Sequence, residues 1–206
     1  MAADIAQGTY EALRNLGVAT VYEGSGGTGA LDAAIKPVWP GAKVCGPAFT
    51  VRCPPGDNLA IHRCLEFVSP GDVLVIQNGG LSGGYWGGIL TVGAQVKGVA
   101  GLVLDGGLRD SEEIGHLGFP AFARGTGVFR TLKHDQGDLQ TPLVVGGVLV
   151  NPGDVILGDS DGVMCIPRAR VDAALEGGSK REAAERAIVE RIRKGELTMD
   201  IYGFRR

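Results

Sequence analysis

Two short apolar segments, each followed by a glycine-rich turn and a helical pattern, constrain the fold of this chain more than any other feature. Residues 73–76 (VLVI) run into the glycine-rich segment 77–84, and residues 86–97 then fit a helix. The same order returns at 102–107 (LVLDGG), after which a helix is predicted to begin near Ser111. This alternation predicts parallel strands with helices packed on them. The loops at the carboxyl ends of such strands meet in one crevice, where open α/β sheets bind their ligands.

The whole chain, residues 1–206, is predicted to form one domain with many tight turns. Glycine supplies 35 of the 206 residues. It lies inside apolar runs and follows no three-residue period, which excludes collagen and a low-complexity linker. Residues 119–167 fit short strands separated by turns, and residues 171–206 fit a long helix with a short tail. The remaining predictions are an extended segment at 42–53 and helices at 4–16, 28–35 and 59–68.

Composition excludes several classes of protein. The chain has 20 Lys and Arg against 23 Asp and Glu, a net charge of −3, so a nucleic-acid-binding surface is not expected. The basic residues of 180–194 alternate with glutamates, which is typical of a solvated helix face. The four cysteines have neither metal-site nor disulfide spacing. Without a signal peptide or membrane span in the sequence, we expect a cytoplasmic protein without a membrane partner.

Two loops contain groups that could do chemistry. The glycine-rich loop 79–88 could present backbone N–H groups to a small carboxylate or phosphate, or it could be a structural turn. Arg109 and Asp110 stand side by side just past a buried strand, where unpaired charges are costly. Arginine can hold a carboxylate through two hydrogen bonds, and aspartate suits Mg²⁺ or Mn²⁺. The structural alternative is an ion pair, with Asp110 capping the next helix. His62 is predicted to face the same crevice.

Motifs spread along nearly the whole chain resemble those of the RraA-like family. They are GPAFTV at 46–51, PPGDN at 54–58, PGDV at 70–73, DGGLRD at 105–110 and GDSDGV at 158–163. Within that family, GVATVYE at 17–23 and GELTMDIYG at 195–203 are similar to the branch of 4-hydroxy-4-methyl-2-oxoglutarate / 4-carboxy-4-hydroxy-2-oxoadipate aldolases. The resemblance implies a swivelling α/β/β domain with central mixed sheets and a C-terminal helix. It also implies assembly as a homotrimer or a homohexamer.

The resemblance further implies a class II pyruvate aldolase that needs a divalent cation, Mg²⁺ or Mn²⁺. Arg109 would bind the pyruvoyl group of a small 2-oxo acid, and Asp110 would be the protein ligand of the metal. Cleavage of a 4-hydroxy-2-oxo acid, or decarboxylation of oxaloacetate, would pass through a pyruvate enolate.

Two further groups of residues receive roles from the resemblance. The start of the helix after the glycine loop would bind the pyruvate carboxylate through Gly87, Gly88, Ile89 and Leu90. Acids of a neighbouring subunit would reach the site, and the corresponding residues here are Glu23 and Glu196.

The chain departs from the aldolase pattern at Gly88, where the family has an acid that orients the water protonating the enolate. Loss of such a proton donor typically costs roughly 10²–10⁴ in rate. Two alternatives therefore stay open beside the aldolase. One is a non-catalytic interaction protein, like the relatives that bind and inhibit ribonuclease E. The other is a lyase for a different 2-oxo acid, admitted by the smaller residue.

Overall fold

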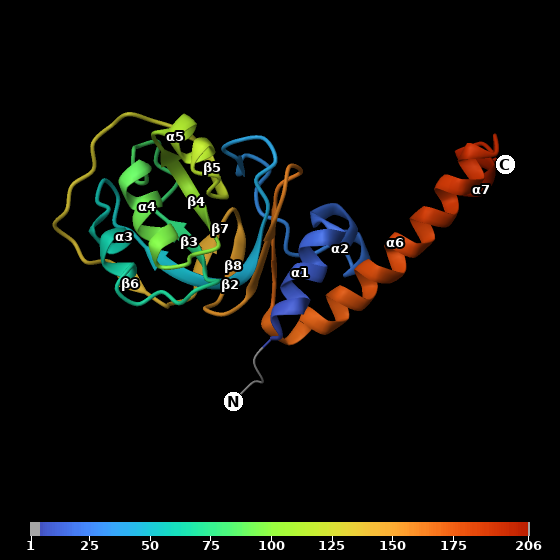
Figure 1. Cartoon of the computed structure of the whole chain (residues 1–206), viewed down its shortest axis with the longest axis horizontal. Helices are drawn as coiled ribbons and strands as arrows, with labels where there is room; N and C mark the ends of the chain where they lie inside the picture. The colour runs from blue at the N-terminus through green and yellow to red at the C-terminus, as the bar shows by residue number, and fades with distance from the viewer. Residues whose placement is uncertain (1–4, 206) are drawn as a thin grey trace.

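A mixed β-sheet forms the centre of the computed structural model, which describes residues 5–205 (Figure 1). Its strands follow the order β1–β5–β4–β3–β2–β9–β10, and β6 pairs with β2. Their bounds are β1 Lys36–Pro37, β2 Val44–Arg52, β3 Val73–Gln77, β4 Gly101–Leu108, β5 Ala121–Thr126, β6 Asp138–Leu139, β9 Val155–Gly158 and β10 Val163–Ile166. A separate antiparallel hairpin consists of β7 (Leu143–Val145) and β8 (Val148–Val150).

Strands β2, β3, β4 and β5 run parallel, as the sequence pattern predicts for β3 and β4. Successive side chains of β3 point to opposite faces, because the side-chain period of a strand is two residues. Leu74 and Ile76 pack with α3 (Leu59–Cys64), α4 (Gly88–Val96) and α5 (Ser111–His116). Val73 and Val75 pack with the β7–β8 hairpin and β9 on the other face. The strands are therefore apolar throughout, and their loops emerge together at the carboxyl edge of the sheet.

A third apolar cluster joins the two N-terminal helices to the outer strands. Helices α1 (Gln7–Leu16) and α2 (Val18–Gly24) pack through Leu13 and Val21 against β9, β10 and the start of α6. Gly17 separates the two helices and ends α1, since its φ is +82° and its N–H bonds the carbonyl of Leu13 at 3.2 Å. The predicted C-cap at Gly17 is confirmed.

Helix α6 (Val171–Arg193) extends away from the body and ends in α7 (Thr198–Ile201), as Figure 1 shows. Its buried residues are Val171, Ala174 and Gly178, all in its first third. Beyond them the exposed helix carries ion pairs one turn apart, such as Arg186 with Glu182. The predicted solvated face is thus confirmed. No helix within residues 5–205 is both long and apolar enough to cross a bilayer.

The helix predicted at 28–35 does not form. Its backbone amides are used elsewhere: Leu31 N–H bonds the carbonyl of Val163, and Asp32 N–H bonds that of Gly146, each at 2.9 Å. The Asp32 carboxylate also pairs with Arg124, which pairs in turn with the buried Asp105 within β4. Long-range pairing with β10 and the hairpin therefore overrides the local helical pattern.

The other predicted elements differ from the structure mainly at their ends. The helix predicted at 59–68 stops at Cys64, and three-residue turns continue to the Ser69–Pro70 step. The predicted helix at 4–16 begins at Gln7, and residue 4 lies outside the described part of the chain. The mixed α/β fold class with a C-terminal helix is confirmed, and the single domain over 1–206 stays a prediction.

Candidate functional site

The candidate site lies where the loops after β3 and β4 meet. The loop after β3 passes through Gly79–Gly80 and Gly83–Gly84 and enters α4 at Gly88. The loop after β4 is only two residues long, Arg109 and Asp110, before α5 begins. The Arg109 N–H bonds the carbonyl of Trp86 at 2.9 Å, which joins the two loops. The crevice predicted from the βαβ pattern is therefore present, and Arg109 and Asp110 lie at it.

Asp110 has an unusual backbone conformation that aims its carboxylate at α4. Its φ of 59° and ψ of 36° are left-handed, a conformation that costs most residues about 1 kcal/mol or more but that aspartate adopts more readily. Asp110 Oδ2 accepts a hydrogen bond from the Gly88 N–H at 3.0 Å and lies 3.6 Å from Arg109 Nε. The side chain makes no capping bond to α5. The ion pair of the structural alternative is therefore present, and Asp110 is the N-cap residue of α5 by position only.

Two carboxylates lie over the α-carbons of Gly87 and Gly88, in the space that a Cβ would need. A Cβ on Gly87 would lie 2.5 Å from Asp110 Oδ2, and one on Gly88 would lie 2.5 Å from Cδ and 2.7 Å from Oε1 of Glu113. Real Cβ atoms do not approach neighbours this closely. The start of α4 is therefore shaped around the carboxylates of Asp110 and Glu113.

Beside this point a cavity of about 330 Å³ opens between the loops. Its lining residues include His62 and, of the predicted site, Gly87, Ile89, Leu90 and Arg109, whereas Gly88 and Asp110 do not line it. Arg130 and Lys133, which the sequence analysis missed, add two cations from the loop after β5. Partial burial of the ring and the charge of Lys133 lower the pKa of His62, which keeps the ring neutral at pH 7. The cavity lining contains three cationic side chains and no carboxylate, so it suits an anion.

The buried Asp57 holds the cationic loop over this cavity. Its carboxylate accepts hydrogen bonds from the N–H groups of Leu59 at 2.8 Å, His134 at 2.6 Å and Asp135 at 3.2 Å. Burial alone would raise the pKa of Asp57, but these three bonds outweigh burial and the pKa lies below the ordinary value. Asp57 thus ties the start of α3 to the segment that carries Arg130 and Lys133.

Because the folded state lowers its pKa, Asp57 adds stability that is present above the unfolded pKa, about 3.9, and is lost as the pH falls below it. Asp57→Asn is expected to destabilise the protein at pH 7 by about 1–3 kcal/mol, the cost of weakening charged hydrogen bonds to buried amides. The variant should also lose less stability than wild type between pH 5 and pH 3, in urea unfolding at several pH values. Asp138→Asn, at an exposed ion pair with Arg52, is the control. Parallel pH profiles for wild type and Asp57→Asn would contradict the assignment.

The structure does not bring Glu23 and Glu196 to this site within one chain. Glu23 lies in α2 and pairs with Arg181 of α6. Glu196, beyond the end of α6, pairs with Arg191 at 2.7 Å. In Figure 1 α2 and the end of α6 lie on the side of the molecule away from α4 and α5. Their predicted roles require a neighbouring subunit and stay a prediction.

The residues present fit a magnesium-type cation. Mg²⁺ is usually bound through one or two carboxylates and keeps several waters. Asp110 is 38% exposed at its side chain and uses one oxygen for the Gly88 N–H, and the Glu113 carboxylate lies beside it over Gly88. Among residues 5–205 no group of three or more His, Cys, Asp and Glu side chains could hold a metal, which disfavours a zinc-type site. Asp110 is the residue that could hold the cation.

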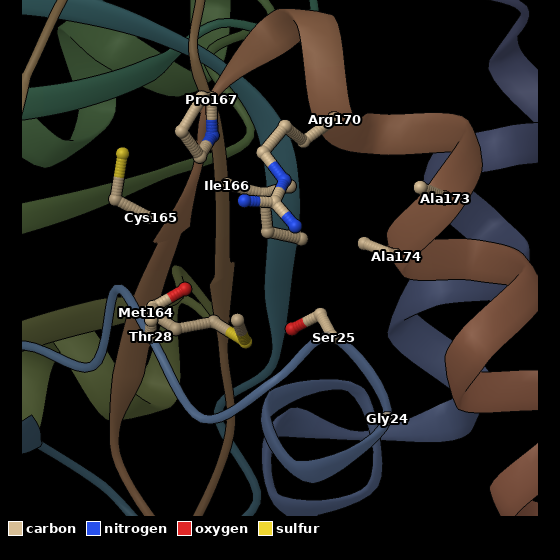
Figure 2. Close-up of a pocket in the computed structure, with 10 residues that line it drawn as sticks. All are labelled: Gly24, Ser25, Thr28, Met164, Cys165, Ile166, Pro167, Arg170, Ala173 and Ala174. Carbon is tan, nitrogen blue, oxygen red and sulfur yellow. The ribbon is translucent and has the colours of Figure 1, made fainter.

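A second hollow, of about 270 Å³, lies on the other side of the molecule between β10 and α6 (Figure 2). Its lining is mainly apolar, with Arg170 extending over it and the Ser25 hydroxyl below. Burial raises the pKa of its thiol, Cys165, to about 12, so this sulfur is neutral and a poor nucleophile. The hollow lacks a carboxylate and shares no residue with the cavity at Arg109.

Parallel strands, with Arg109 and Asp110 on the loops at their carboxyl ends and a small cationic cavity beside them, define an α/β protein with a compact small-molecule site. The pattern of the RraA-like family (Aldolase/RraA) matches residues 17–165, and the chain belongs to this family.

Individual relatives agree with the family. The chain is 40% identical over 167 residues to a protein of Halalkalibacterium halodurans named "Putative 4-hydroxy-4-methyl-2-oxoglutarate aldolase", covering 79% of this chain and 80% of that one. Among solved structures, an uncharacterized protein of Pseudomonas syringae pv. tomato matches with a TM-score of 0.89 and 28% identity, over 100% of this chain and 97% of the other. RraAS2 of Streptomyces coelicolor, described as an unusual member of the RNase ES inhibitor RraA protein family, matches with a TM-score of 0.78 and 28% identity, over 89% and 96%.

Proposed function

We propose that this protein is a divalent-metal-dependent lyase that releases pyruvate from 4-hydroxy-2-oxo acids or from oxaloacetate. The observation that carries the proposal is the meeting of Arg109 and Asp110 at the first turn of α4, beside a cavity without carboxylates in its lining. The similarity to a relative named as an aldolase supports the same reaction class.

The first turn of α4 and Arg109 would hold the 2-oxo acid. Within residues 5–205 the N–H groups of Ile89 and Leu90 have no hydrogen-bond partner, because they belong to the open first turn of a helix. They and the positive end of the helix suit the substrate carboxylate. Arg109 Nε is turned toward Asp110, so the guanidinium lies beside the Asp110 carboxylate. From there it can stabilise negative charge on the 2-oxo oxygen as the C3–C4 bond breaks. Mg²⁺ or Mn²⁺, held by Asp110, would supply Lewis-acid polarisation of that carbonyl.

Arg130 and Lys133 narrow the range of possible substrates further. Both line the cavity on the side contributed by the loop after β5. Both residues are exposed at the edge of the cavity, where a second carboxylate of the substrate would pair with them and a monocarboxylate held at Arg109 would not. The proposed substrates, oxaloacetate and carboxylated 4-hydroxy-2-oxo acids, have such a group.

Pyruvate release tests the function directly. Release from oxaloacetate and from 4-carboxy-4-hydroxy-2-oxoadipate, coupled to lactate dehydrogenase, is expected with Mg²⁺ and is expected to disappear with EDTA. Release that is equal with and without EDTA would contradict the metal requirement.

A non-catalytic interaction protein is the second candidate, favoured by the likeness to RraAS2. No pyruvate release from either substrate, together with no effect of Mg²⁺ on the melting temperature, would favour the interaction protein over the lyase.

We also propose a homo-oligomer, a trimer or a dimer of trimers. The far end of α6 and the tail expose apolar side chains away from the body, among them Ile192, Leu197, Met199 and Phe204. Tyr202 and Phe204 stack on each other with ring centroids 5.4 Å apart. On α4, Ile89 at the cavity and Val96 at the end of the helix are more than four-fifths exposed. Exposed apolar surface of this kind is typical of protein interfaces.

Light scattering coupled to gel filtration is expected to give three or six times the chain mass. Phe204→Asp should lower that mass, because it puts a charge into the buried interface. A monomeric wild-type chain would contradict the proposal.

A further inference from the structure

The Glu113 side chain occupies the space in front of Gly88 that a side chain at that position would fill. The place where a Cβ of residue 88 would stand is 2.5 Å from Glu113 Cδ and 2.7 Å from Oε1. We infer that Glu113 is the proton-transferring acid of the proposed lyase, supplied from α5 rather than from α4. The inference rests on the proposed function and adds one catalytic residue to it.

The position of Glu113 in α5 brings it to this point. Asp110 is the N-cap residue of α5, and Glu113 lies three positions further on, in the first turn of the helix. Asp110 lies against Gly87 and Glu113 against Gly88, so the two carboxylates occupy adjacent places along the start of α4. The intervening Glu112 points elsewhere and lines a shallow hollow with Trp39 and His116. Glu112 is therefore a matched control on the same helical turn.

The contribution of Glu113 to the fold is limited to its negative charge in the first turn of α5. Within residues 5–205 its carboxylate makes neither an ion pair nor a hydrogen bond, while Asp110 pairs with Arg109 and Gly88. The Glu113 carboxylate is exposed and is therefore free to exchange a proton with a bound substrate.

The chemistry of aldol cleavage needs such a group, and the atoms balance without a further reagent. The Glu113 carboxylate takes the proton of the C4 hydroxyl, the C4–O bond becomes a carbonyl, and the C3–C4 bond breaks. The electron pair of the broken C3–C4 bond forms the C2–C3 double bond of the pyruvate enolate. The same proton then returns to C3, the double bond supplies the C3–H pair, and the C2 carbonyl re-forms. Oxaloacetate loses CO₂ to reach the same enolate and has no 4-hydroxyl to deprotonate.

This difference between the two substrates gives a sharp test in the full-length protein with Mg²⁺. Glu113→Gln is expected to lower kcat for 4-carboxy-4-hydroxy-2-oxoadipate by about 10²–10⁴, the usual value of a positioned acid or base. Its kcat for oxaloacetate should fall by less than about tenfold, since solvent can protonate the enolate. The KM for the hydroxy acid should change little. Glu112→Gln should match wild type in every respect.

A second variant keeps the test independent of folding. Gly88→Asp combined with Glu113→Ala empties the space in front of residue 88 and returns a carboxylate to it from the other helix, so aldol cleavage is expected to recover at least tenfold over Glu113→Ala alone. The Mg²⁺-induced rise in melting temperature should persist in Glu113→Gln, because Asp110 remains.

The outcomes separate the two proposals. Wild type without pyruvate release from either substrate would overturn the proposed function and this inference with it. Active wild type with unchanged aldol cleavage in Glu113→Gln, or with equal losses on both substrates, would overturn the role of Glu113 alone.

Discussion

Arg109→Ala is expected to lower kcat/KM for pyruvate release by about 10²–10³ with either substrate, the usual cost of removing one group that stabilises developing oxyanion charge. The Arg109 side chain is the cation that lies directly at Asp110, with Nε 3.6 Å from Oδ2. Arg130 and Lys133 enter the cavity from the loop after β5 and are not paired with Asp110. Their charges therefore cannot replace a guanidinium at the first turn of α4.

Arg52→Ala is the matched control. Its side chain is 51% exposed and pairs with Asp138 at 3.8 Å, against 49% and 3.6 Å for Arg109 and Asp110. Both substitutions remove a half-exposed arginine from an ion pair of similar length, so their effects on folding should be alike and small. Arg109→Lys should recover only part of the rate, because lysine keeps the charge but lacks the two-pronged geometry. Wild-type kcat/KM in Arg109→Ala would contradict the site.

The parts of the site that the sequence predicts are those fixed by local pattern. Apolar segments of strand length, each ending in glycine or Asp-Gly-Gly, identify β3 and β4, and parallel strands put their carboxyl-end loops at one edge. Arg109 and Asp110 follow directly from the position of β4. The contact between Asp110 and the Gly88 N–H is not local, since it depends on how α4 and α5 lie against each other.

The missed residues depend on long-range contacts. Arg130 and Lys133 come from a segment without regular structure, held by Asp57, which is 77 positions away from His134 in the chain. The one available signal was that β5 also runs parallel, so that its following loop must open at the same edge. The wrong helix at 28–35 has the same cause, because its amides pair with carbonyls of residues 146 and 163.

Gly88 shows how a departure from a family pattern can be misread from sequence alone. A glycine in place of an acid indicates a lost function as long as only that position is considered. The structure places the Glu113 carboxylate over the Gly88 α-carbon, so the missing Cβ is also what makes room for it. The sequence shows Glu113 only as one of the acidic residues in the first turn of a helix. Such residues are common there because negative charge interacts favourably with the helix dipole. The direction of the Glu113 side chain can be seen only once the packing of α4 against α5 is known.

Asp110→Asn is expected to abolish the stabilisation of the protein by Mg²⁺ and to reduce pyruvate release to the level seen with EDTA. A ligand at a hundredfold excess over its Kd stabilises the folded state by about 2.7 kcal/mol. For a chain of this length that corresponds to a rise in melting temperature of about 5–10 °C. Wild type should show this rise on titration with MgCl₂ and the variant should not, because the amide has lost the anionic oxygen that a hard cation requires.

Asparagine is the right replacement because it removes the anionic metal ligand and keeps the backbone conformation. Like aspartate it tolerates the left-handed conformation, here φ 59°, and its Oδ1 can still accept the Gly88 N–H. Asp110→Ala would add backbone strain of about 1 kcal/mol and leave that N–H unpaired, so a lost Mg²⁺ response could reflect a misplaced loop. The melting temperature of Asp110→Asn without metal is therefore expected to stay close to that of wild type. A preserved Mg²⁺ response in this variant would show that Asp110 is not the metal ligand, and its loss in Asp110→Asn together with its retention in Glu113→Gln would assign the two carboxylates to different tasks.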